Sequence, residues 1–224
     1  MKIQFAQRFP PGGRNLYFSM STMIHNHHAL LDEARGGSAI AIGQLLENYT
    51  SYLTLLARVQ IGRRLQGKAD PGDIVQETFL EAHRQMRNFR GTTEAELLAW
   101  LRRILAGEIA LMLRRYLGTK GRDVKLEREL AVQIDQSSMI MDGGFVATHS
   151  TPSQHASRRE QAVLLAESLE KLSDNYREVI VLRHLEGLSF PDVAARMGKT
   201  EDSVQKLWVR ALAGLRKSMG GTPT

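Results

Sequence analysis

Cysteine is absent from the 224 residues of this chain, so disulfide bonds, thiolate metal sites and cysteine nucleophiles are excluded. The sequence also lacks any apolar run close to the length of about 18 residues that a membrane-spanning helix needs. Lys2 and Arg8 lie near the N-terminus, but no continuous apolar segment follows them, so a secretory signal is not expected. We therefore expect no membrane insertion.

Patterns that would indicate an enzyme are also missing. There is no glycine-rich loop that could cradle a phosphate, and no nucleophile stands in a recognisable pattern with a base. His25, His27 and His28 form a group that could hold a metal only adventitiously, because no predicted fold surrounds it. His83 and His184 have no carboxylate at a matching spacing. We therefore predict that the chain is not an enzyme and has no cofactor or metal site.

Strand-like alternation and internal repeats are missing as well, which leaves helices as the expected elements. Hydrophobic residues make up 42% of the chain, and its length allows one large domain or two small domains with real cores. Lys and Arg number 30 against 24 Asp and Glu, a net charge of +6. That excess favours a polyanionic partner, although many soluble proteins carry a similar one.

Apolar residues recur at helical spacing through the first half of the chain. The helices predicted there are 39–65, 73–89, 93–117 and a short one around 126–134. Asp73 is the expected N-cap of the second helix, and Gly107 is a weak point of the third. Three long helices joined by short turns predict one compact helical domain.

The second half of the chain is predicted to hold four further helices, at 158–172 and 175–186 and as a pair within 188–217. Ser189 caps the first helix of the pair, with Asp192 completing a capping-box-like motif, and Gly198 ends it. Thr200 then caps a basic helix. This pair predicts a helix-turn-helix whose second helix enters a DNA major groove. A plain helical hairpin with a solvated face is the alternative.

Composition changes between 136 and 157, where Gly, Ser, Thr and Pro are frequent and Asp142 is the one charged residue. This predicts a flexible tether.

The Pro-Pro-Gly-Gly run at 10–13 predicts a disordered leader. The segment 15–20 partly resembles a protease-site remnant, which leaves open whether the leader is native. The predicted organisation is all-α, with two small helical domains joined by a flexible linker: leader 1–22, first domain 23–122, linker 123–157 and helix-turn-helix domain 158–220.

Two segments carry a resemblance to a known family. DPGDIVQETF at 70–79 follows the pattern Asp-x-x-Asp-(Leu/Ile)-x-Gln-Glu-(Thr/Ala)-Phe, with Trp-Leu at 100–101 at the usual distance. LRHLEGLSFPDVAARMG at 182–198 precedes the last helix. With these motifs the chain resembles the extracytoplasmic-function (ECF) sigma factors of the sigma-70 family, which keep the second and fourth conserved regions. The resemblance covers 37–118 and 158–218 and implies a cytoplasmic protein.

The resemblance implies that the helix at 73–89 docks on core RNA polymerase, chiefly on the clamp coiled coil of the β′ subunit. An acidic stripe with residues four apart suits a basic partner surface. The residues predicted to bind the polymerase are Asp73, Gln76, Glu77 and Glu81. A solvated helix face with local pairs, such as Glu81 with Arg84, is the alternative.

The resemblance further implies that the helix at 93–117 holds single-stranded DNA of the promoter −10 element, with extruded bases stacked in pockets. The residues predicted to contact it are Arg90, Thr92, Trp100, Arg102, Arg103, Arg114 and Arg115, with Tyr116, Lys120 and Arg122 near the phosphates. A core position is the alternative for Trp100. Family members commonly have an Asn-containing stretch where this chain has Ala-Gly-Glu at 106–108, which leaves its −10 preference open.

The last helix is expected to read the −35 element as duplex DNA. The predicted contact residues are Thr200, Glu201, Ser203, Gln205, Lys206 and Arg210. Trp208 and Val209 replace the small or basic residues often found there, and Trp208 is expected to pack against the neighbouring helix. This packing leaves room for a specificity that differs from that of better-known members.

Together these expectations describe a sigma factor that binds core RNA polymerase, through its β′ clamp and β subunit, and directs it to promoter DNA. An anti-sigma factor is a further partner that the resemblance allows, although no residue of the sequence identifies one. Two other functions stay open at this stage. One is a stand-alone helix-turn-helix regulator that binds symmetric half-sites. The other is a helical adaptor or metal-dependent enzyme whose basic surface serves another anion.

Overall fold

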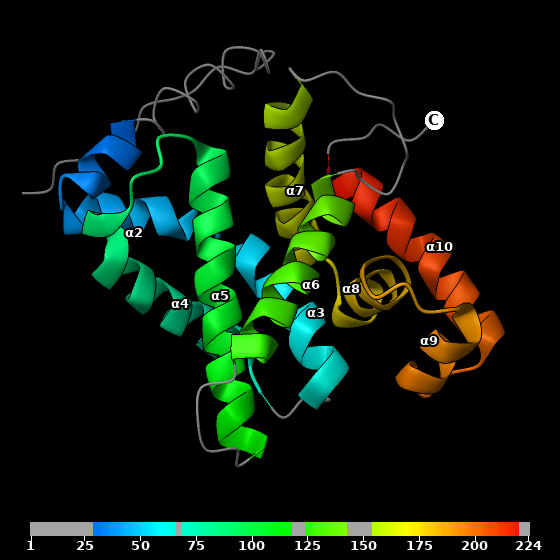
Figure 1. Cartoon of the computed structure of the whole chain (residues 1–224). Helices are drawn as coiled ribbons and strands as arrows, with labels where there is room; N and C mark the ends of the chain where they lie inside the picture. The colour runs from blue at the N-terminus through cyan, green and yellow to red at the C-terminus, as the bar shows by residue number, and fades with distance from the viewer. Residues whose placement is uncertain (1–28, 66–68, 118–123, 143–153, 220–224) are drawn as a thin grey trace, which may run out of the picture.

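The computed structural model describes residues 29–65, 69–117, 124–142 and 154–219, and every regular element in these ranges is helical (Figure 1). The predicted leader at 1–22, the histidine group at 25–28, and Lys120 and Arg122 lie outside the described residues. The same holds for 143–153 of the predicted tether. The all-α fold class expected from the sequence is confirmed for the described part of the chain.

The first long helix predicted, 39–65, is in fact two helices. After a helix over 29–35, α2 runs from Ala39 to Glu47 and α3 from Thr50 to Leu65. The break lets Tyr49 enter the core, where it is 2% exposed and its hydroxyl donates to Glu94 Oε1 at 3.0 Å. Burial, followed by the neighbouring Glu94 carboxylate, raises the pKa of Tyr49 far above its ordinary value, so this hydroxyl remains a donor.

Helix α4 extends from Pro71 to Gln85 and starts earlier than predicted. Its N-cap is Asp70, whose Oδ1 accepts from the Gly72 amide at 2.8 Å, so the prediction of Asp73 as the cap was wrong. Pro71 suits the first helical position because its missing N–H would be unpaired there anyway. Asp73 lies in the first turn, where the helix dipole favours a negative charge and the side chain stays exposed. A single 3₁₀ turn, η1 (Met86–Asn88), follows α4.

Helix α5, Glu94–Leu117, runs the length of the first half and passes through Gly107 without a break. Helix α6 then extends from Val124 to Asp142. The short helix expected around 126–134 is therefore present but longer, and the tether predicted to begin at 136 does not begin there. The physical reason is burial: Leu130, Ile134 and Met141 have no exposed surface, so α6 is a packed part of the fold.

The C-terminal part holds α7 (Gln154–Glu170), α8 (Asp174–Ile180), η2 (Val181–Leu185), α9 (Phe190–Met197) and α10 (Glu201–Ser218). The helix-turn-helix caps are those predicted. Ser189 Oγ accepts from the Asp192 amide, and Thr200 Oγ1 accepts from the Ser203 amide, each at 3.3 Å. Gly198 takes the left-handed conformation at φ 62° that ends α9.

The two halves pack together. Helix α7 lies against α3 and α6, and the Ser51 hydroxyl of α3 is hydrogen-bonded to the Glu170 carboxylate of α7. Figure 1 shows α2 and α4 on one side of the molecule and α9 and α10 on the other, with α3, α5 and α6 between them. Among the helices that the structure describes, none combines the length and apolar character needed to cross a bilayer.

Candidate protein and nucleic-acid interfaces

The residues predicted to read duplex DNA all lie on the exposed surface of α10. The six side chains are Thr200, Glu201, Ser203, Gln205, Lys206 and Arg210. The opposite side of the helix buries Val204, Ala211 and Leu215 against the rest of the C-terminal part. This separation follows from helical periodicity, since 100° per residue places 203, 206 and 210 together and 204, 211 and 215 opposite.

Two of these α10 side chains are held by neighbours one turn away. Lys206 Nζ donates to Asp202 Oδ2 at 2.7 Å, and Gln205 Nε2 donates to Glu201 Oε1 at 3.0 Å. Such exposed pairs are weak and exchange readily for a stronger partner. Within the described part of the chain, Arg210 makes no hydrogen bond or ion pair. The face therefore offers one unengaged cation and two polar groups in exchangeable pairs.

The predicted polymerase-binding residues share one face of α4. Asp73, Gln76 and Glu77 are exposed, and Glu81 is partly exposed. The Glu81 carboxylate accepts hydrogen bonds from Gln85 and from Arg84, the latter at 3.1 Å. These two bonds, that of Gln85 first, lower the pKa of Glu81, so its carboxylate stays ionised to lower pH than an ordinary glutamate.

A groove of about 550 Å³ separates this face from the C-terminal half of α5. It is lined by Ala69, Asp70, Asp73, Ile74, Gln76, Glu77, Glu108, Met112, Arg115 and Tyr116. Burial first, and then the charges of Glu77 and Glu81, raise the pKa of Glu108. The acidic surface thus spans two helices. Sequence reasoning treated Glu108 only as a departure from the family pattern, because no local spacing links it to α4.

The seven residues predicted to bind −10 DNA do not form one surface. Trp100, Arg103 and Arg114 share one side of α5, as their helical spacing requires. Trp100 is half-buried with its ring centroid 4.9 Å from that of Phe89, so it both packs on the core and keeps part of its surface exposed. Arg114 has a buried Nη1 atom with no hydrogen-bond partner among the described residues.

The other predicted −10 residues lie elsewhere. Arg90 and Thr92 are exposed in the loop before α5, where the Thr92 amide donates to Glu96 Oε2 at 2.9 Å. Arg115 lines the acidic groove, although its helical position is only about 60° from that of Trp100. Arg102 is about 200° around the helix from Trp100. The structure therefore brings together one part of the predicted set, turns Arg102 away from it and places Arg115 at the acidic groove.

Arg102 joins α5 to α6 and α3. Its Nε donates to Asp135 Oδ1 at 2.6 Å, and its Nη1 donates to the Tyr52 hydroxyl at 3.2 Å. The Tyr52 hydroxyl in turn donates to Ser138 Oγ at 2.9 Å, in surroundings that leave Tyr52 1% exposed. The Arg102 side chain is 18% exposed. A guanidinium held by two partners in this way serves the packing of α6 first.

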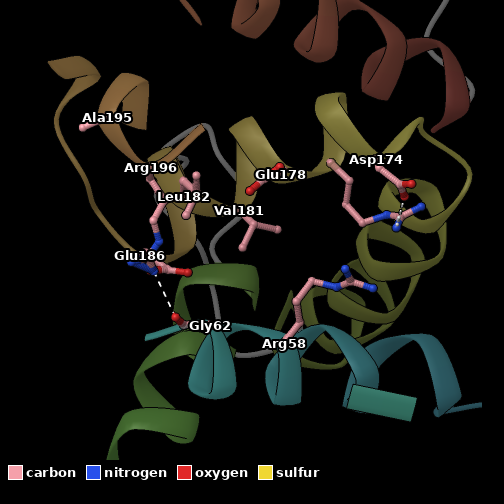
Figure 2. A pocket seen from close by; sticks show the side chains of 10 residues that line it. Arg58, Gly62, Asp174, Glu178, Val181, Leu182, Glu186, Ala195 and Arg196 are labelled. Carbon is pink, nitrogen blue, oxygen red and sulfur yellow. Dashed lines mark hydrogen bonds and ion pairs between the residues drawn. The ribbon is translucent and has the colours of Figure 1, made fainter. Parts of the chain in front are cut away.

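A second cavity, of about 580 Å³, lies between α3 and the C-terminal part (Figure 2). Arg58 and Gly62 line it from α3, and Glu186 and Arg196 from the helix-turn-helix side. Arg196 Nη2 donates to the Gly62 carbonyl at 3.0 Å and is 3.5 Å from Glu186 Oε2. Figure 2 shows this contact to one side of the other lining residues. It is a direct link between α9 and the first half of the chain.

Comparison with known proteins assigns both halves to described families. The model "Sigma-70 region 2" matches residues 49–117, and the model "Sigma-70, region 4" matches residues 162–215, together more than half of the chain. The chain is 27% identical over 183 residues to the ECF RNA polymerase sigma-E factor of Haemophilus influenzae, covering 82% of this chain and 89% of that protein. It is 26% identical over 182 residues to the factor of the same name from Escherichia coli K12, covering 81% and 88%.

Two solved structures match this chain at a similar level of sequence identity, with low TM-scores. The structure of CnrH in complex with the cytosolic domain of CnrY is 26% identical, covers 87% of this chain and 97% of that one, and superposes with a TM-score of 0.32. A chain of the RsbN–BldN complex is 24% identical, covering 84% of this chain and 97% of that one, with a TM-score of 0.30.

Proposed function

Because the chain belongs to the ECF group of the sigma-70 family, we propose that its α4 face docks on core RNA polymerase while α5 and α10 contact promoter DNA. The chain directs promoter-specific transcription initiation, as sigma factors of this family do. The single observation that supports the residue assignment is the placement of the acidic α4 face and the exposed α10 face on opposite sides of the molecule. One factor can then hold two partners at once.

The polymerase contact in this proposal is electrostatic. Asp73 and Glu77 of α4 line the groove with Glu108 of α5, and Glu81 extends the acidic face along α4. The groove is open to a basic side chain of the partner. Complementary charge of this kind accelerates association and selects against acidic partners. We assign the clamp coiled coil of the β′ subunit as the surface that meets this face, with the β subunit as a further contact.

The −10 contact is assigned to the side of α5 that carries Trp100, Arg103 and Arg114, together with Arg90 and Thr92 in the preceding loop. Extruding a base from the duplex costs a few kcal/mol, and stacking on an aromatic ring returns about 1–3 kcal/mol per base. The exposed part of the Trp100 ring would offer such a platform, with Phe89 packed beside it. The proposed contact leaves Arg102 with α6, and Arg115 at the acidic groove.

The −35 contact is assigned to the exposed face of α10. Arg210 and Lys206 would bind guanine edges or phosphates, and Gln205 would bind adenine. Lys206 and Gln205 must exchange their pairs with Asp202 and Glu201 for these contacts, which costs little at an exposed position. Thr200, Glu201 and Ser203 lie at the start of the helix, where a recognition helix approaches the base edges.

The remaining parts of the proposal concern organisation and setting. We assign 23–122 and 158–220 as the two functional domains and 123–157 as the connection, of which 124–142 is the packed helix α6. The factor is not an enzyme, since the polymerase carries out the chemistry, and it acts in the cytoplasm where polymerase and promoter are. An anti-sigma factor is a further expected partner.

The central test is run-off transcription with purified core RNA polymerase on a library of promoter sequences. The full-length chain is expected to bind core and to initiate from a small set of templates that share a −10 and a −35 element. Tight binding to a palindromic duplex without polymerase would instead favour a stand-alone regulator.

The α4 assignment is tested by the double substitution Glu77→Lys and Glu81→Lys. Reversing two charges at a complementary surface should weaken core binding by about 100-fold, because like charges then face each other. The measurement is core affinity by fluorescence anisotropy of the labelled factor. The matched control is Glu33→Lys with Glu129→Lys, which changes the net charge equally at exposed positions away from this face. Equal loss in both variants would contradict the assignment.

A further inference from the structure

The large aromatic side chain of the recognition helix faces inward. Trp208 of α10 is half-buried, and its Nε1 donates to Nε2 of His184 at 2.9 Å. The two rings are nearly parallel, with 18° between their planes and centroids 6.0 Å apart. Since Nε2 accepts, the neutral imidazole carries its proton on Nδ1. The pair therefore combines a directional hydrogen bond with ring contact.

An irregular turn presents His184 to α10. Residues Val181–Leu185 form a π-helical turn at the end of α8, a rare insertion that is frequent at functional positions. Arg183 on the same turn donates from Nη1 to the Leu188 carbonyl at 2.9 Å, which holds the following loop. The turn thus fixes two neighbouring side chains in different directions, one toward the loop and one toward the recognition helix.

Phe190, at the start of α9, completes the cluster. Its ring meets the Trp208 ring edge-on, at 78° with centroids 5.5 Å apart. The Arg183 guanidinium also lies over the Phe190 ring, 4.9 Å from its centroid. Aromatic and cation–π contacts of this geometry add stability beyond simple burial. Through Trp208 the cluster connects η2, α9 and α10.

The rotation of α10 about its own axis matters for its DNA-binding face. Side-chain positions lie about 5–6 Å from the helix axis, so a rotation of 10° moves Lys206 and Arg210 sideways by about 1 Å. A displacement of that size is enough to misplace a paired hydrogen bond to a base. Val204, Ala211 and Leu215 hold the helix by apolar contact, which is not directional. A hydrogen bond is directional, so the Trp208–His184 bond is suited to set this angle.

We propose that His184 and Trp208 are positioning residues that set the orientation of α10 for −35 recognition. The proposal rests on the proposed function of α10. Burial, followed by the charge of Arg183, lowers the pKa of His184, which keeps the ring neutral and able to accept at physiological pH. Neither residue contacts DNA in this scheme. They act through the angle at which Lys206 and Arg210 are presented.

The test compares two templates in transcription by full-length factor with core RNA polymerase. The first is a promoter selected by the wild-type holoenzyme from a library with a randomised −35 element. The second has the same −10 region already opened as a bubble and carries no −35 element. The variants are His184→Phe and Trp208→Phe, which keep the ring contact but lose the hydrogen bond, their double combination, and His184→Gln, which retains an uncharged acceptor.

The expected result is a loss of about fivefold in apparent promoter affinity for each Phe variant on the −35 template, as one neutral hydrogen bond implies. The double variant should lose no more than either single one, because both remove the same bond. His184→Gln should recover most of the affinity, and all variants should equal wild type on the opened template. Circular dichroism and thermal unfolding report whether each variant keeps the helical fold.

Full −35 activity of either Phe variant would overturn the proposal, as would additive losses in the double variant. Equal losses on both templates, or loss of the helical signal, would assign the pair to folding alone and would also overturn it. Failure of the wild-type factor on both templates is a different outcome, since it would contradict the proposed function itself.

Discussion

At the scale of single residues, Glu108 shows how a charged side chain can be held against its own preference. Partial burial and the carboxylates of Glu77 and Glu81 oppose its ionisation, and Arg115 and Arg84 relieve only part of this. An ionisable group whose charge is disfavoured and not fully compensated by neighbouring residues is typical of functional surfaces. A basic side chain of a partner entering the groove would neutralise it, which agrees with polymerase docking at this face.

Glu108→Gln is therefore expected to stabilise the free protein at neutral pH. A carboxyl whose pKa is raised in the folded state from 4.5 is protonated more readily when folded than when unfolded. Its contribution to stability is present at low pH and is lost as pH rises through the folded pKa. The substitution should raise the free energy of unfolding at pH 7 by about 0.5 kcal/mol, reduced by solvent screening. Urea denaturation measures it.

The stability gain of Glu108→Gln should vanish near pH 3.5, about one unit below the ordinary carboxyl pKa. At that pH Glu108 is neutral in both the folded and the unfolded state. Glu129→Gln, at an exposed position of α6, is the control and should have no effect at either pH. A gain that persists unchanged in acid would mean that packing rather than charge explains it.

At the scale of elements, α6 changes the picture of the connection between the two halves. It buries Leu130, Ile134 and Met141 and is joined to α5 by Arg102 with Asp135. The Asp135 carboxylate is half-exposed, so this ion pair gains less than a fully buried one. Its partner is largely buried, however, and a buried guanidinium without a carboxylate is unfavourable.

Asp135→Ala should lower the free energy of unfolding by about 1 kcal/mol because it leaves Arg102 without its anion. Gln136→Ala removes an exposed neighbour on the same helix and should change it by less than about 0.5 kcal/mol. Urea titration followed by circular dichroism gives both values. Equal effects of the two substitutions would show that helix propensity, not the tie to α5, determines the stability of α6.

At the scale of the whole molecule, the packed arrangement cannot bridge a promoter. A compact chain of this length measures about 45 Å across. The centres of the −10 and −35 elements lie about 25 base pairs apart, or about 85 Å along the duplex at 3.4 Å per base pair. The contact of Arg196 with Gly62 holds α9 directly against α3. Promoter binding by both halves therefore requires them to separate.

We expect fluorescent labels on α3 and α9, placed at Arg58 and Ala195, to show high energy transfer in the free factor. Both positions line the cavity between the halves (Figure 2). Transfer should fall when core polymerase and a promoter with both elements are added, and should stay high with a duplex that lacks both. High transfer in an active initiation complex would contradict the separation.

Much of this protein follows from local sequence. The helix-turn-helix could be predicted because its determinants lie within a few residues of each other: Ser189 with Asp192, the left-handed Gly198, and Thr200 with the amide of Ser203. The acidic α4 face followed from helical spacing in the same way. A helix cap or a one-sided helical stripe depends on the backbone geometry of residues close together in the chain. The amino-acid sequence alone is therefore sufficient to predict it.

Tertiary structure decided which side chains are free and which are engaged. Arg102 looks like its neighbour Arg103 in sequence, but Asp135, 33 residues later, binds one and leaves the other exposed. The charge of Glu77 acts on Glu108, and Trp208 is hydrogen-bonded to His184, across similar separations in sequence. Periodicity shows which side of a helix faces outward but not which helix lies next to it. The packing of α6 and the mutual contact of the two halves depend on that second relation, which arises only when the whole chain buries its apolar surface at once.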